Sequence, residues 1–186
     1  MKATPLFLLV KHAALVAFVA LMPSLSVADS PPEAPGKQKV FSANKVFFVL
    51  SDPKTQATVG FKKTALAKPL ELWRMQGYFP VISISDDGRH CVAVYAGGNL
   101  LNLDHRADET MLSFYDRGQL IHHVRLDEIV KEPDQLRRTA SHYLWANSFG
   151  FVTPHRFHVG MPDGKTLVFD ATSGRSLPPK SRQSSQ

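Results

Sequence analysis

Cysteine is nearly absent from this sequence, since Cys91 is the only one in a chain of 186 residues. A single thiol cannot form a disulfide within the chain, so packing alone must hold the core together. Cys91 lies in the apolar run HCVAVY. A small thiol in such a run is expected to be buried and unreactive.

Clusters of positive charge and long hydrophobic runs are also lacking. The chain has 22 Lys and Arg residues against 16 Asp and Glu, and the basic residues are scattered along it. This pattern argues against a nucleic-acid partner. The longest apolar run, residues 13–22, is shorter than the roughly 20 residues that a transmembrane helix needs.

The first 28 residues have the features of a secretory signal peptide. Lys2 and Lys11 supply positive charge, the apolar run 13–22 follows, and small residues lead up to Ala28. This pattern predicts cleavage after Ala28 and a secreted or periplasmic protein. No transmembrane span is expected in the remaining chain.

Glycine-containing turns divide the rest of the chain into short apolar runs. Asp87-Gly88, Arg117-Gly118 and Asp163-Gly164 each separate two runs, and such dipeptides favour β-hairpins because glycine adopts positive φ. The runs flanking these turns are 81–85 and 90–95, 111–116 and 119–126, and 156–161 and 165–170. Further expected strands are 45–51, 58–62, 70–75 and 141–145.

These signals predict an all-β fold, mainly an antiparallel meander of about ten short strands. One short helix is expected near 126–131, because Leu126, Ile129 and Val130 recur at helical spacing. The predicted organisation is a flexible linker over 29–39, a single β-rich domain over 40–177 and a disordered polar tail over 178–186.

Two of the hairpins resemble parts of a known repeat. The segments VISISDDGRHCVAVY (81–95) and LSFYDRGQLIHHVRL (112–126) together resemble one four-stranded blade of the YVTN or WD type of β-propeller. Residues 158–177 are similar to both halves in compressed form, and LELWRMQGYF (70–79) is similar to the end of an earlier blade. The resemblance implies a binding or scaffold role and transfers no catalytic residue.

The length of the chain conflicts with a complete propeller. Closed propellers have at least four blades of about 40 residues each, and 40–177 is too short for four. We therefore expect a meander of two to three blade-like units around one core. One alternative is a homo-oligomer whose protomers complete a propeller-like assembly by pairing strand edges.

Histidine offers the most obvious metal ligands, but its spacing is unfavourable. Neither H-E-x-x-H nor H-x-H occurs, and the adjacent His122 and His123 would point to opposite faces of a strand. The sequence therefore predicts no metal site, no cofactor and no catalytic residue. The histidines after the signal peptide are His90, His105, His122, His123, His142, His155 and His158.

The favoured function is a non-catalytic binding or scaffold module with a protein or cell-envelope partner. Its candidate binding residues combine aromatic rings with one imidazole, because such rings stack on ligands or anchor partners. They are Trp73, Tyr78, Tyr143, Trp145 and His142. The alternative is a small secreted hydrolase or metal-binding protein that uses His142, next to Ser141, or the acidic loop 104–109.

Overall fold

The computed structural model describes residues 35–65, 68–132 and 135–178. The predicted signal peptide, most of the predicted 29–39 linker and residues 179–186 of the predicted tail lie outside this part. The described residues form fifteen strands and one short helix, which confirms the all-β prediction. None of their helices is long and apolar enough to cross a membrane.

The elements follow one another in the order β1 (Gln38–Phe41), β2 (Phe47–Asp52), β3 (Ala57–Lys62), β4 (Leu70–Gln76), β5 (Ile82–Ile84), β6 (His90–Val94), β7 (Leu100–Asn102), β8 (Thr110–Asp116), β9 (Gln119–Arg125), α1 (Leu126–Ile129), β10 (Arg137–Arg138), β11 (His142–Leu144), β12 (Ser148–Thr153), β13 (Arg156–Gly160), β14 (Thr166–Asp170) and β15 (Ser176–Leu177).

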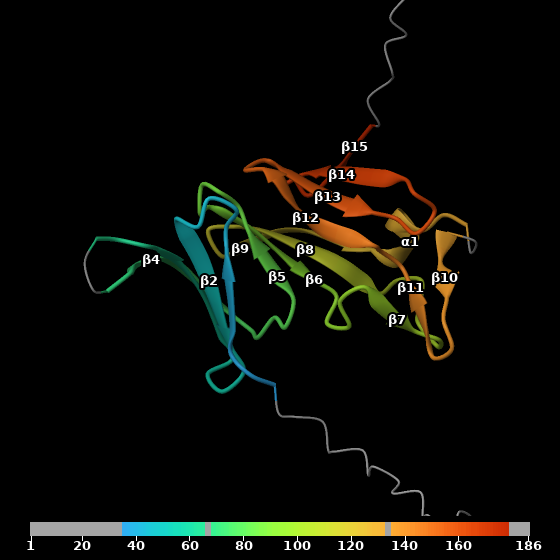
Figure 1. The fold of residues 1–186 in the computed structure, drawn as a ribbon, viewed down its shortest axis with the longest axis horizontal. Helices are drawn as coiled ribbons and strands as arrows, with labels where there is room; N and C mark the ends of the chain where they lie inside the picture. Colours follow the sequence, from blue (N-terminus) through green and yellow to red (C-terminus); the bar gives the residue numbers. More distant parts are fainter. Residues whose placement is uncertain (1–34, 66–67, 133–134, 179–186) are drawn as a thin grey trace, which may run out of the picture. The chain divides into compact units, whose positions relative to one another are not determined.

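Three four-stranded antiparallel sheets make up most of this structure (Figure 1). We call them blade 1 (β1–β2–β3–β4), blade 2 (β5–β6–β8–β9) and blade 3 (β12–β13–β14–β15). Each runs as a meander from one edge to the other, which confirms the blade-like resemblance. A fourth, smaller sheet, the side sheet, has the order β10–β11–β7.

The three predicted glycine turns form as expected. Gly88, Gly118 and Gly164 have φ values of +70°, +77° and +86°, in the left-handed region that favours glycine. Each turn joins antiparallel partners, namely β5 with β6, β8 with β9, and β13 with β14. The local turn chemistry therefore sets the hairpins of blades 2 and 3.

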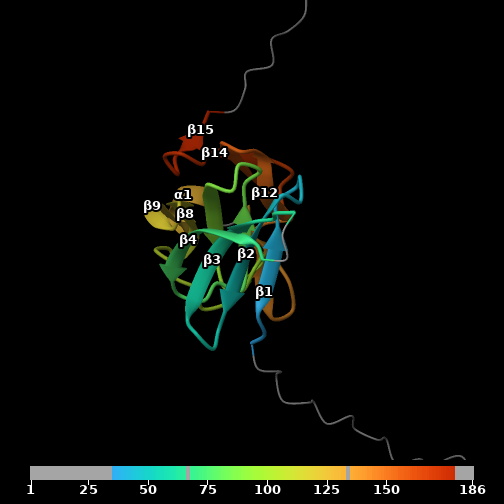
Figure 2. The ribbon, with the colours of Figure 1, turned by 90° about the vertical axis from the view of Figure 1, so that its left-hand side faces the viewer.

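Blade 2 is covered on both faces. Its first strand, β5, contacts β1 and β2 of blade 1 and β12 of blade 3. Alternate residues of β6 therefore enter different clusters: Cys91 packs with residues of blade 1, whereas Val92 and Val94 pack toward blade 3. Figure 2 shows blade 1 from its outer side, with blade 2 behind it.

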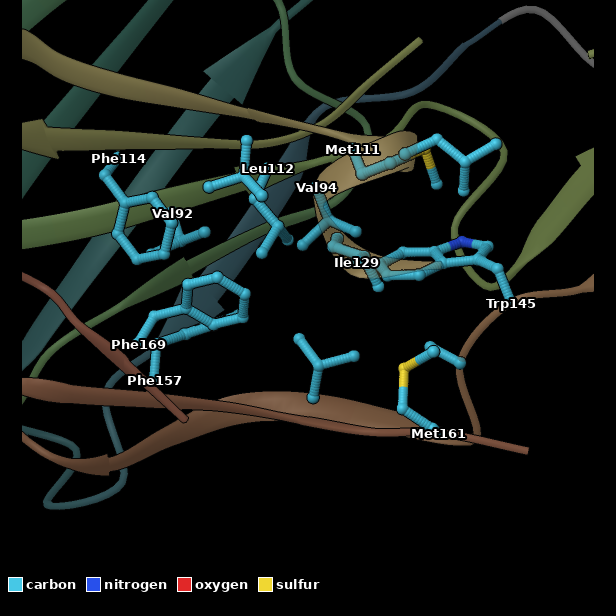
Figure 3. Packing of buried hydrophobic residues seen from close by; sticks show 14 of the residues in the cluster. Val92, Val94, Met111, Leu112, Phe114, Ile129, Trp145, Phe157, Met161 and Phe169 are labelled. Atoms are coloured by element: carbon cyan, nitrogen blue, oxygen red, sulfur yellow. The ribbon is translucent and has the colours of Figure 1, made fainter. Parts of the chain in front are cut away.

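Two hydrophobic clusters form, where the sequence analysis expected one core. The smaller lies between blades 1 and 2 and consists of Val49, Trp73, Met75, Ile82, Ile84 and Cys91. The larger joins blades 2 and 3, α1 and the side sheet. In it the Phe114 ring lies 5.9 Å from that of Phe157 and 5.7 Å from that of Phe169, measured between centroids (Figure 3).

The structure also adds strands that the sequence analysis missed. These are β1, β7, β10, β12 and β15. The first of them includes Gln38 and Lys39, which the sequence analysis assigned to the linker. The short helix predicted near 126–131 is confirmed as α1, which is shorter than predicted and ends at Ile129.

Candidate functional site

The side sheet is built from two connections that leave the blade pattern. Strand β7 lies in the connection between β6 and β8 of blade 2, whereas α1, β10 and β11 lie between blades 2 and 3. The two connections meet where β7 pairs with β11, for example at Leu101 and Tyr143. Together they form a pocket of about 360 Å³. It is lined by His105, Ala107, Leu126, Asp127, Val130, Lys131, Glu132, Leu136 and Tyr143.

We call this pocket the side pocket. One part of it is apolar and aromatic. Leu126, Val130 and Leu136 supply aliphatic groups. The rings of His105 and Tyr143 meet edge to face, with centroids 5.4 Å apart and an interplanar angle of 82°. Because the His105 Nδ1 lies 2.9 Å from the carbonyl oxygen of Asn102, the imidazole is held in place.

The rest of the side pocket is charged. The Asp127 Oδ2 accepts a hydrogen bond of 2.9 Å from the Arg125 guanidinium, and the Lys131 Nζ donates one of 2.9 Å to the Asp127 carbonyl. The other carboxylate oxygen, Asp127 Oδ1, is buried and has no hydrogen-bond partner among the described residues. Because this oxygen is covered by protein, the polar edge of the pocket is formed by the rest of the Asp127 side chain, which is 41% exposed, and by Lys131.

Helix α1 is positioned by its own sequence. The Glu128 carboxylate accepts a hydrogen bond of 2.9 Å from the Arg125 amide, which satisfies a backbone donor at the start of the helix. Asp127 and Glu128 also place negative charge in the first turn, where the helix dipole favours it. Leu126 and Ile129 belong to the larger cluster, while Leu126 also lines the pocket together with Asp127 and Val130.

Two of the five predicted binding residues are buried tryptophans. Trp73 is 6% exposed and donates its indole N–H to the Gly88 carbonyl at 2.8 Å. Trp145 is fully buried and donates to the Gly98 carbonyl at 2.7 Å. Both indoles pack within the hydrophobic clusters, so they are not available to stack on a ligand.

The other three predicted binding residues lie nearer the surface. Tyr78 is half-buried and donates its hydroxyl to the Gly36 carbonyl at 3.2 Å. Tyr143 lines the side pocket. His142, next to it in the chain, has its Nδ1 2.9 Å from the Ser141 hydroxyl. Of the five, only Tyr143 contributes to this pocket.

The Ser141–His142 contact resembles part of a hydrolase triad. The sequence analysis named His142, next to Ser141, as part of an alternative hydrolase site, and the hydroxyl and the imidazole come within hydrogen-bond distance. A triad also needs an acidic residue that orients the imidazole. Among the described residues, no carboxylate lies within ion-pair distance of His142.

The acidic loop 104–109 does not gather its carboxylates around one point. Arg106 forms a two-pronged ion pair with Asp108, with both N–O distances at 2.9 Å. This hydrogen-bonded guanidinium lowers the pKa of Asp108 and occupies its two oxygens. The contribution of the loop to the side pocket comes from His105 and Ala107.

A different cluster joins residues that sequence spacing could not connect. Asp87, His90 and His155 place one ligating atom each within 4.8 Å of the others. The two imidazoles meet edge to face, with centroids 5.5 Å apart. The sequence analysis listed both histidines but did not consider Asp87 as their neighbour. The Asp-x-x-His spacing across the Gly88 turn is the only local signal of this cluster.

No protein-family model matches the sequence, and no match was found among curated proteins. Among solved structures, the chain is similar to the WD40 repeats of RRP9, with 8% identity and a TM-score of 0.42. It is also similar to the periplasmic gluconolactonase PpgL of Pseudomonas aeruginosa, with 15% identity and a TM-score of 0.41. Each match covers 80% of this chain and 39% of the other protein. The chain thus spans about two-fifths of the length of these proteins.

Proposed function

We propose that this protein is a secreted or periplasmic, non-catalytic binding module in which the blades are the scaffold and the side pocket receives the ligand. The observation that carries the proposal is the convergence of two separate connections on one pocket. Binding residues are commonly carried by loops that a rigid scaffold positions. Here that scaffold is blade 2 packed against blade 3.

The lining of the side pocket defines the chemistry of the ligand. A volume of about 360 Å³ lies within the range of small-molecule sites. The aliphatic wall and the Tyr143 ring favour an apolar, flat group, and the partly exposed Asp127 carboxylate favours a hydrogen-bond donor at its edge. An aromatic group with an N–H or O–H, carried by a small molecule or displayed by an envelope component, meets both requirements.

Indole is a probe of this chemistry because it combines a flat apolar ring with one N–H donor. We expect titration of the ¹⁵N-labelled protein with indole to shift the amide signals of residues around the side pocket. The Tyr143→Ala variant removes the aromatic wall. An aromatic contact contributes about 0.5–1.5 kcal/mol, so this variant should bind indole roughly 2- to 10-fold more weakly.

Tyr78→Ala is the matched control, because Tyr78 is also a half-buried tyrosine but does not line the side pocket. It should leave the affinity for indole unchanged. Shifts that fall elsewhere on the protein, or equal losses in both variants, would contradict the assignment of the binding site.

The predicted export of the chain has its own test. Expression of the complete sequence in a Gram-negative host, followed by fractionation, should place the protein outside the cytoplasm. Its intact mass should correspond to a chain that begins at Asp29, because signal peptidase is predicted to cleave after Ala28. A cytoplasmic protein of full-length mass would refute this part of the proposal and leave the binding site untouched.

One observation favours the second candidate, a homo-oligomer that extends the blade series. The face of blade 1 turned away from blade 2 carries Phe41, Phe48 and Phe61, none of which belongs to either hydrophobic cluster. The Phe48 ring stacks on that of Phe61 at a centroid distance of 5.1 Å and contacts that of Phe41 in a tilted arrangement at 5.4 Å, and Phe41 is 41% exposed. Light scattering that detects only monomer at high protein concentration would exclude this candidate.

A further inference from the structure

Three potential metal ligands meet where blades 2 and 3 adjoin. Asp87 lies in the turn between β5 and β6, His90 is the first residue of β6, and His155 lies between β12 and β13. Their ligating atoms are all within 4.8 Å of one another. The centre of such a triangle is within about 2.8 Å of each atom, and zinc bonds to nitrogen or oxygen are about 2.0–2.2 Å long. Side-chain shifts of less than about 1 Å would complete the coordination.

His90 provides the second, independent sign of a ligand. Its side chain is only 2% exposed, yet its Nδ1 has no hydrogen-bond partner among the described residues. The His90 Nδ1 lies 3.4 Å from the Asp87 Oδ2, which is an ion-pair contact but not a hydrogen bond. Buried polar atoms are nearly always satisfied, and coordination of a metal ion by the Nδ1 lone pair would satisfy this one.

Asp87 is held with one oxygen directed at the cluster. Its Oδ1 accepts hydrogen bonds from the Ser85 hydroxyl and, at 2.8 Å, from the Arg89 amide. This leaves the Oδ2 on the side of His90. The guanidinium of Arg89 does not compete for this oxygen, because it forms a two-pronged ion pair with Asp116 at 2.6 and 2.7 Å. Such supporting contacts are typical around metal-binding carboxylates.

His155 supplies the ligand from the neighbouring blade and is open to solvent. Its carbonyl accepts a hydrogen bond of 2.9 Å from the Ala171 amide, which fixes the turn. The side chain itself is exposed, and the Asp87 side chain is 31% exposed. An ion can therefore enter from solvent, and water can complete its coordination.

We propose that Asp87, His90 and His155 bind one divalent transition-metal ion, for which Zn²⁺ is the representative, and that this ion joins blade 2 to blade 3. Two imidazoles and one carboxylate suit zinc and its neighbours, whereas calcium and magnesium prefer sites made of oxygen ligands alone. The site is separate from the side pocket, so the proposed function does not depend on it.

The test measures Zn²⁺ binding to the complete mature protein by isothermal titration calorimetry after treatment with a chelator. We expect one strong site per chain. His155→Ala should weaken it by more than the roughly 10- to 100-fold that loss of a supporting contact alone costs. Asp87→Asn, which keeps an oxygen acceptor for the turn, should also weaken it. Because His155 is exposed, its replacement should leave the circular dichroism spectrum unchanged.

His123→Ala is the matched control, since His123 is an exposed histidine on β9 that is not part of the cluster. It should bind Zn²⁺ like the natural protein. Zn²⁺ should also raise the melting temperature of the natural protein and of His123→Ala, but not that of His155→Ala. Equal affinity in the natural protein and His155→Ala, or an equal loss in His123→Ala, would overturn the proposal. So would binding with no rise in melting temperature, because the ion would then not join the blades.

Discussion

The contact between blades 1 and 2 depends on a glycine that has no room for a side chain. Gly88 has a φ of +70°, and a Cβ at this position would overlap the ring of Phe47 in blade 1. Its carbonyl oxygen also accepts the indole N–H of Trp73 at 2.8 Å. We therefore expect Gly88→Ala to strain the turn and to push the two blades apart.

The size of this effect follows from two contributions. A non-glycine residue in the left-handed region costs about 1–2 kcal/mol. Overpacking of a filled interior costs a further 1–3 kcal/mol, roughly. Gly88→Ala should thus lower the free energy of unfolding by about 2–5 kcal/mol. Gly164→Ala is the matched control: its φ is +86°, but no atom lies within 4 Å of the added Cβ, so only the first contribution applies.

Urea unfolding followed by tryptophan fluorescence measures both variants. Trp73 and Trp145 are the only tryptophans of the chain, and both are buried, so their emission reports loss of packing. Gly88→Ala should be the less stable variant by about 1–3 kcal/mol. Equal losses in the two variants would refute the claim that Gly88 is a packing contact between blades.

Two further predictions concern the hydrophobic clusters. Burial raises the pKa of the Cys91 thiol, so the thiol should stay protonated at pH 8. It should react with a thiol reagent only when denaturant unfolds the chain, and rapid labelling of the native protein would contradict its burial. Phe114→Ala should lower the free energy of unfolding by about 3–5 kcal/mol, because the ring is fully buried against Phe157. Leu120→Ala is the control, because the Leu120 side chain is 50% exposed, and it should change the free energy of unfolding by less than about 0.5 kcal/mol. Similar losses of stability in Phe114→Ala and Leu120→Ala would show that the larger cluster is wrongly placed.

The parts of the fold that were predicted correctly are those with strong local sequence signals, such as glycine turns. Gly88, Gly118 and Gly164 each mark a hairpin by a residue type that the turn geometry requires, and all three hairpins form. The four strands of blade 2 were predicted in their correct order for this reason. Positive φ is a property of the turn itself and needs no information about distant residues.

The missed strands lack such signals. Strand β7 has three residues, and its partner β11 lies about forty positions further along the chain. Strand β12 contains Gly150, which weakens the strand pattern, and β15 has only two residues. Short strands of this kind form because a neighbouring strand offers hydrogen bonds, and the sequence does not say which strand that is.

The same limit explains the candidate sites. Tyr143 was predicted for its residue type, but its meeting with His105 depends on the pairing of β7 with β11. His90 and His155 come together only because blade 2 packs against blade 3. Trp73 and Trp145 show the converse, because an aromatic residue that could bind a ligand is used to fill the interior.

The attachment of blade 1 by one face has a consequence for the motions of the protein. The cluster beneath it contains six buried residues, compared with sixteen in the cluster shared by blades 2 and 3. Since regions with fewer buried contacts open at lower free energy, β1 to β4 should behave as a separate foldon. Their amide hydrogens would exchange with solvent through partial openings in which the rest of the molecule keeps its native order.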